Sequence, residues 1–221
     1  MKRLLIRTLS FCLVLSACGG ESQPTSTSIE SRPNTTPEVV FAELVEALEA
    51  GEPERTAALT DPLQVPLLVI AEGVQARQVA DLTAADRTMV AVNFWQGFAE
   101  QLSSSLGNGF AQLQSGELGR VEVAGSQFAT VDLVLPADAS ARRLVFRDTD
   151  EGWVVDLIAS FPSPLLGLIP DAAQAIRASG DAELIETLRS YEASVRFVLA
   201  DAEIDPRLNQ AATAALEAIV R

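Results

Sequence analysis

The chain has 221 residues, 48% of them hydrophobic, and a formal net charge of −14. This apolar content excludes a wholly disordered chain. The acidity argues against binding to nucleic acid or to anionic lipid headgroups, because both are recognised through Lys and Arg. The chain contains no His, and its single Lys is Lys2.

The first residues have the pattern of an export signal. Three basic residues precede an apolar run over residues 8–15, and the small residues Ser16 and Ala17 follow it. The run is too short for a membrane-spanning helix, which needs about 20 apolar residues, but it fits a signal peptide. We predict a signal peptide at residues 1–17, with an ordinary secretory signal as the alternative to the lipoprotein signal described next.

The tetrad Leu15-Ser16-Ala17-Cys18 resembles the lipobox of bacterial lipoproteins. The resemblance implies a diacylglyceryl group with palmitate-like chains on Cys18, which becomes the first residue of the mature protein. It also implies a cell-membrane location on the extracytoplasmic face, or the outer membrane if the host is Gram-negative. The partner expected from it is the membrane itself, reached through the lipid on Cys18.

Cleavage of the signal peptide would leave the mature chain with fewer kinds of reactive side chain. Lys2 and Cys12 would leave with it, and Cys18 would carry lipid, so we expect no disulfide. Without His, Lys or a free thiol, catalysis would depend on Asp, Glu, Arg, Ser, Thr or the single tyrosine, Tyr191. We expect no cofactor and no metal site.

Residues 18–37 are rich in Gly, Ser, Thr, Pro and Glu and contain one aliphatic residue, Ile29. Such a segment cannot bury apolar surface, so we predict a disordered tether. Helical periodicity begins directly afterwards. Thr36 is the expected N-cap of the first helix, with Pro37 at its first position and Gly51 at its end. Helices are predicted over residues 37–50, 53–59, from 66 onward, and about 84–106.

The apolar period then changes to two, which predicts strands. Four strands are expected as an antiparallel meander, over residues 120–124, 128–135, 142–147 and 152–160. One face should be apolar, with Val121 and Val123 on the same side as Val131. Helices return after an apolar connector at 161–170, over 171–179, 181–200 and from 205. The fold class is α+β, with a domain at 38–161 and a C-terminal helical segment, 162–221, packed on it.

The second face of the meander collects charged residues. Alternation places Asp132 and Asp156 there with Arg143 and Arg147, which could line a polar pocket and supply catalytic or binding candidates. Ordinary cross-strand charge pairing is the alternative that we favour.

Three further segments have two interpretations each. The turn over residues 148–152 is similar to the start of a calcium loop, but it lacks the later ligands, so we favour a hairpin turn. The aromatic residues Phe94, Trp95 and Phe98 could bind an apolar ligand, although helical spacing favours core. The apolar connector at 161–170 is interpreted as a plug inside the fold in preference to an exposed contact.

Residues 37–62, and the strand sequence Gly152-Trp-Val-Val-Asp156, resemble NTF2-like (SnoaL-like) domains. The resemblance implies an N-terminal helix pair that covers a curved antiparallel sheet around a cone-shaped cavity. It leaves open an NTF2-like small-molecule enzyme that uses Asp132 or Asp156 for acid–base chemistry.

Three functions remain open, and a non-enzymatic one is favoured. The first is a lipid-anchored envelope lipoprotein that binds a protein partner or an apolar small molecule. The second is the enzyme just described. The third is a structural envelope component without a ligand.

Overall fold

The structure, a computed structural model, describes residues 36–221 except 107–113, 116–117, 135–140 and 202–205. The predicted signal peptide, Cys18 and nearly all of the tether lie outside the described residues. The first group of helices comprises α1 (Pro37–Ala50), α2 (Pro53–Ala58), α3 (Val65–Ala71), η1 (Ala76–Asp81) and α4 (Ala84–Leu106). The strands are β1 (Gln114–Ser115), β2 (Gly119–Val123), β3 (Ser126–Val134), β4 (Ala141–Thr149) and β5 (Gly152–Val155). The last group comprises α5 (Leu157–Ser160), α6 (Pro162–Leu165), η3 (Leu166–Leu168), α7 (Ile169–Ser179), α8 (Ala182–Ala200) and α9 (Pro206–Val220).

This order of elements confirms the α+β prediction. Helices precede and follow an antiparallel sheet in which β2, β3, β4 and β5 pair in sequence order, and the short β1 also pairs with β3. Helix α1 has the predicted ends: Thr36 is its N-cap, Pro37 opens it, and Gly51 ends it in the left-handed conformation at φ 67°. Glycine takes this conformation without the steric cost that a Cβ brings.

The hairpin between β2 and β3 turns one residue earlier than predicted. Ala124 (φ 52°) and Gly125 (φ 83°) form a two-residue turn, so that Val121 lies opposite Phe128. Residues directly opposite each other point to the same face of a sheet. Because Phe128 in turn lies opposite Arg147, Val121 lies on the face of Arg147. The prediction that placed Val121 and Val123 with Val131 is therefore wrong.

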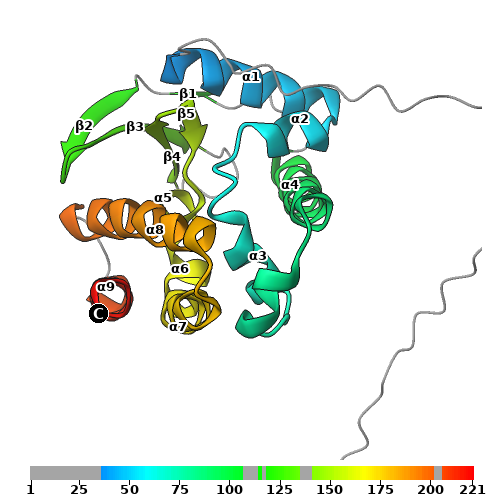
Figure 1. Ribbon diagram of the computed structural model, residues 1–221. Helices are drawn as coiled ribbons and strands as arrows, with labels where there is room; N and C mark the ends of the chain where they lie inside the picture. The colour runs from blue at the N-terminus through cyan, green and yellow to red at the C-terminus, as the bar shows by residue number, and fades with distance from the viewer. Residues whose placement is uncertain (1–35, 107–113, 116–117, 135–140, 202–205) are drawn as a thin grey trace, which may run out of the picture. The chain divides into compact units, whose positions relative to one another are not determined.

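Helices cover the two faces of the sheet from opposite sides (Figure 1). On one face, the Phe41 ring of α1 meets Phe146 edge-on at 6.1 Å between ring centroids. On the other, Phe197 of α8 packs against Phe128 at 4.6 Å. The face on which the charged residues were predicted is therefore covered in part by α8.

An aromatic cluster fills the space between α4 and the segment after the sheet. Trp95 contacts Phe94, Phe98 and Phe161, all with nearly perpendicular rings. Trp95 is fully buried, and its Nε1 donates a hydrogen bond to Thr60 Oγ1 at 2.7 Å. These contacts confirm the core interpretation of the aromatic stripe.

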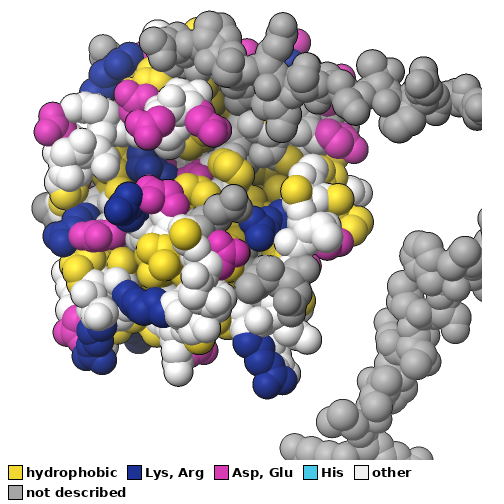
Figure 2. Space-filling view, in the orientation of Figure 1, with side chains coloured by type: hydrophobic (Ala, Val, Ile, Leu, Met, Phe, Trp, Pro, Cys, Tyr) yellow, Lys and Arg dark blue, Asp and Glu magenta, His cyan; other side chains and the backbone are white. Residues whose placement is uncertain are grey.

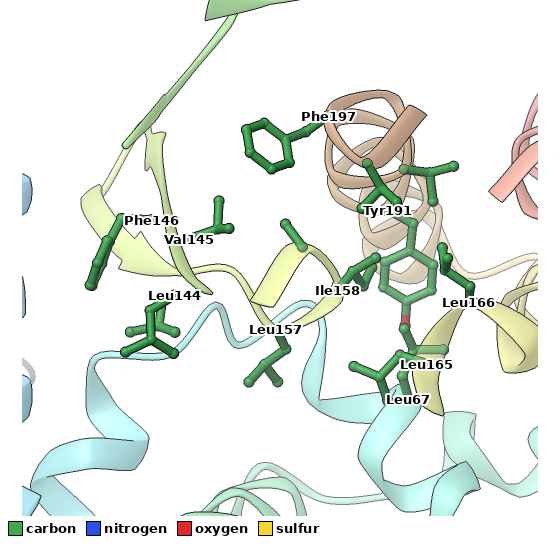
Figure 3. Packing of buried hydrophobic residues seen from close by; sticks show 14 of the residues in the cluster. Leu67, Leu144, Val145, Phe146, Leu157, Ile158, Leu165, Leu166, Tyr191 and Phe197 are labelled. Carbon is green, nitrogen blue, oxygen red and sulfur yellow. The ribbon is translucent and has the colours of Figure 1, made fainter. Parts of the chain in front are cut away.

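The apolar connector lies inside the fold. It is helical, forming α6, η3 and the start of α7, and Leu165, Leu166 and Ile169 are buried. Figure 3 shows Leu165 and Leu166 close to Tyr191 of α8. The plug interpretation is confirmed, and an exposed contact at these residues is excluded.

The surface carries both charges. Figure 2 shows acidic and arginine side chains interspersed over one face, and exposed ion pairs such as Arg120–Glu38 and Arg55–Glu52 occur among them. Pairs of this kind contribute about 0–1 kcal/mol each. Among the helices that the structure describes, none is both long and apolar enough to cross a membrane.

Replacing Phe98 with Ala tests whether the aromatic cluster is core. Phe98 is 7% exposed, so Phe98→Ala should lower the free energy of unfolding by about 3–5 kcal/mol. The control on the same helix is Met89→Ala, at an exposed position, which should change it by about 0.5 kcal/mol or less. Denaturant unfolding measures both, and equal effects would contradict a core role for Phe98.

Candidate functional site

The four charged residues predicted to share one pocket form two separate pairs. Arg143 Nε lies 2.9 Å from Asp132 Oδ1 directly across the sheet, and its Nη1 lies 2.7 Å from Asp201 Oδ2, just beyond α8. The Arg143 and Asp132 side chains are 38% and 50% exposed. This pair is the ordinary cross-strand pairing that the sequence favoured.

Arg147 and Asp156 form the other pair, and it is buried. Arg147 Nε donates to Asp156 Oδ2 at 3.0 Å, and Nη2 donates to Asp61 Oδ2 and to Ser190 Oγ. The two aspartate side chains are 0% and 3% exposed. We call the set of Asp61, Gln64, Arg147, Asp156, Ser190 and Ser194 the Arg147 cluster.

Asp156 reaches this cluster because the last strand ends earlier than predicted. The strand was expected to run to Ser160, but β5 ends at Val155 and α5 begins at Leu157. Asp156 is the N-cap, and its Oδ1 accepts a hydrogen bond from the Ala159 N–H at 2.9 Å. An aspartate that can cap a helix offers the chain an alternative to continuing the strand.

Asp61 is positioned by backbone pairing with the last strand. The Asp61 N–H donates to the Val155 carbonyl, and the Val155 N–H donates to the Leu59 carbonyl. The Asp61 side chain also accepts from the Leu63 N–H at 2.9 Å, a local turn typical of aspartate. The segment between α2 and α3 is thereby held against the edge of the sheet.

Helix α8 completes the cluster with two serines one turn apart. Ser190 Oγ donates to Asp61 Oδ2 at 2.7 Å, and Ser194 Oγ donates to Asp156 Oδ2. Gln64 connects the parts: its Nε2 donates to Ser194 Oγ at 2.8 Å, and its Oε1 accepts from the Ile158 N–H at 3.0 Å. Three segments far apart in sequence meet through these contacts.

Burial and charge act on the cluster in opposite directions. Burial raises the pKa of the Asp61 carboxyl above its ordinary value, although the neighbouring Arg147 guanidinium opposes this. Burial also opposes the charge on Arg147, but Asp156 and Asp61 outweigh it and raise the pKa of the guanidinium. Arg147 is therefore charged, while Asp61 is easier to protonate than a free aspartate.

Tyr191 lies beside the cluster on α8. It is fully buried, and Figure 3 shows its hydroxyl directed toward Leu67 and Leu165. Among the described residues, that hydroxyl has no hydrogen-bond partner. Burial, followed by the charge of Asp61, raises the pKa of Tyr191 far above its usual value, so this side chain is a neutral phenol.

The hydrogen bonds and ion pairs of the Arg147 cluster hold three segments of the chain together. Each carboxylate accepts from the guanidinium, a serine hydroxyl and a backbone N–H. A serine that donates to a carboxylate has the geometry of an activated nucleophile. Yet Ser190 and Asp61 are both buried, at 4% and 2% exposed, so a substrate would reach them only if α8 moved.

The segment considered as a calcium loop is a hairpin turn. Residues 148–152 make the β4–β5 hairpin turn, in which Thr149 Oγ1 donates to the Gly152 carbonyl at 2.7 Å. Across the described ranges, no group of three or more His, Cys, Asp or Glu side chains is placed to hold a metal ion.

Sequence reasoning identified Arg147 and Asp156 but missed their partners. Asp61 precedes Pro62, a pattern typical of the end of a helix, while Gln64 stands directly before an apolar run. A weak signal lies in α8: Ser190 and Ser194 are four residues apart on the side of Tyr191 and Val195. Polar residues within an apolar stripe indicate a buried polar contact, without indicating its partner.

Replacing Arg147 tests whether the Arg147 cluster stabilises the fold. Arg147→Met should leave two buried carboxylates without their cation and lower the free energy of unfolding by about 3–5 kcal/mol. Arg143→Met, on the same strand and face, should cost about 1 kcal/mol or less, because its pairs are partly exposed. Chemical denaturation at neutral pH measures both, and a small effect of Arg147→Met would show that the cluster does not hold the fold together.

No protein-family model matches this chain, and neither a curated protein nor a solved structure matches it significantly.

Proposed function

We propose that this chain is a lipid-anchored cell-envelope protein whose folded part has a non-enzymatic binding role. The observation that carries the proposal is the tetrad Leu15-Ser16-Ala17-Cys18 behind a basic start and a short apolar run. The described fold begins at Thr36, which leaves a polar segment between Cys18 and the first helix. A tether of this composition would let the folded part stand away from the bilayer surface.

The surroundings of the candidate acids support a non-enzymatic role. Asp156 is fully buried and occupied by protein donors, and Asp132 is half exposed and paired with Arg143. A general acid or base must come within hydrogen-bond reach of a substrate proton. As they stand, Asp156 is closed to a substrate, and Asp132 lies on the surface beside a competing cation.

A protein partner is favoured over an apolar small molecule. Phe94, Trp95 and Phe98 were the candidates for an apolar ligand, and they pack against one another and against Phe161. These rings already bury each other's surface, which leaves recognition to the exterior of the fold. The location we propose is the extracytoplasmic side of the cell membrane.

A second candidate, an enzyme using carboxylate chemistry, rests on one contact. Ser190 Oγ donates to Asp61 Oδ2 at 2.7 Å, and Arg147 stands beside both. Displacement of α8 would expose this arrangement. Native mass spectrometry of the protein from its own membranes separates the proposals: a retained protein subunit supports the first, and a retained small polar molecule supports the second.

Cys18→Ala tests the anchor. The variant should lose acylation, because the thiol that would carry the diacylglyceryl group is gone, and the protein should leave the membrane fraction. Intact-mass spectrometry and detergent phase partitioning measure the two effects. Ser16→Thr, a mild change two residues before the cysteine, serves as the control and should keep the lipid. A Cys18→Ala protein that stays membrane-bound after a salt wash would contradict a lipid anchor at this residue.

A further inference from the structure

The Arg147 cluster has one more negative group than positive among the described residues. Two carboxylates, Asp61 and Asp156, both accept hydrogen bonds from a single guanidinium, and all three side chains are 10% exposed or less. Burying an ion without full compensation is unfavourable, and a titratable group escapes the cost by changing its protonation state.

Within the described ranges, no second cation forms an ion pair with Asp61. Helix α8 presents the neutral Ser190 and the phenol of Tyr191, and the segment before α3 presents Gln64. Arg87 of α4 acts electrostatically on Tyr191, and among the described residues the ion pair of Asp61 is with Arg147. Arg147 opposes the rise in the pKa of Asp61, and the negative charge of Asp156 adds to it.

We propose that Asp61 is a proton-binding site and that the Arg147 cluster is a pH-sensitive fastening between α8 and the rest of the fold. Acidification adds a proton from solvent to the Asp61 carboxylate, which removes the surplus charge. A serine hydroxyl has two acceptor lone pairs, and Ser190 Oγ accepts from Arg147 Nη2 at 2.8 Å and from Gln64 Nε2 at 3.4 Å. The protonated carboxyl would donate to Ser190 in place of the longer Gln64 bond. The proposal does not depend on the lipid anchor.

The direction of the pH effect follows from proton linkage. Burial raises the pKa of folded Asp61 above that of the unfolded chain. The stabilisation from this group is therefore fully present below the unfolded pKa, about 3.9, and is lost as pH rises through the folded pKa. The Arg147 cluster therefore stabilises the packing of α8 more in mild acid than near neutral pH.

The first experiment compares the pH dependence of unfolding in the full chain with Asp61→Asn and Asp132→Asn. Between the two pKa values, the unfolding constant of the wild type should rise by up to about tenfold per pH unit relative to Asp61→Asn. Asp132→Asn, on the exposed pair, should follow the wild type. If the Asp61→Asn and wild-type curves are parallel across this range, the proposal is wrong.

The second experiment needs no substitution, so it remains decisive if Asp61→Asn fails to fold. Carbon-13 NMR of the aspartate carboxyls in the full chain, assigned through bonds, gives the titration midpoint of each group. Asp61 should titrate above about 3.9, the value of an unperturbed aspartate, and the amide-exchange protection of residues 190–195 should increase as Asp61 gains its proton. A midpoint for Asp61 at or below about 3.9, or unchanged protection in α8, would overturn the proposal.

Discussion

The contact on which the rest of the structure depends is the shared guanidinium of Arg147. It joins Asp61, which lies between α2 and α3, to Asp156 at the end of the sheet, and both to the serines of α8. Breaking a buried pair costs more than forming it contributes, because the remaining charge stays uncompensated. The cluster therefore makes the N-terminal helices, the sheet and the C-terminal helices depend on one another.

The two faces of the sheet are covered by different means. Toward α1 the contact is apolar and aromatic, as in Phe41 against Phe146. Toward α8 an apolar contact, Phe197 on Phe128, lies on the same face as the Arg147 cluster. An NTF2-like domain would be expected to enclose a cavity within its sheet. Here α8 contributes the buried Ser190, Tyr191, Ser194 and Phe197 to the covered side.

Short-range sequence patterns predicted the helices and strands well, whereas contacts between residues far apart in the sequence were not predicted. The capping residues Pro37 and Gly51 identified the ends of α1, and the alternation of valines identified the strands. Both signals depend on residues that are close together in the sequence. The face of β2 was wrong because a two-residue turn at Ala124 and Gly125 replaced the expected three-residue one. Asp61 and Ser190 are 129 residues apart, and no local pattern links them. Periodicity places a side chain on a face but does not identify what meets it.

The two serines of α8 limit the positions in which that helix can pack against the rest of the fold. A helix with a purely apolar face can turn or slide on an apolar surface and still bury similar area. Two hydroxyls one turn apart that must each meet a separate carboxylate allow far fewer arrangements. Rotation by one residue would carry both hydroxyls away and leave polar groups buried without partners. The Arg147 cluster thus adds a polar constraint on the register of α8 to the one that apolar packing such as Phe197 on Phe128 imposes.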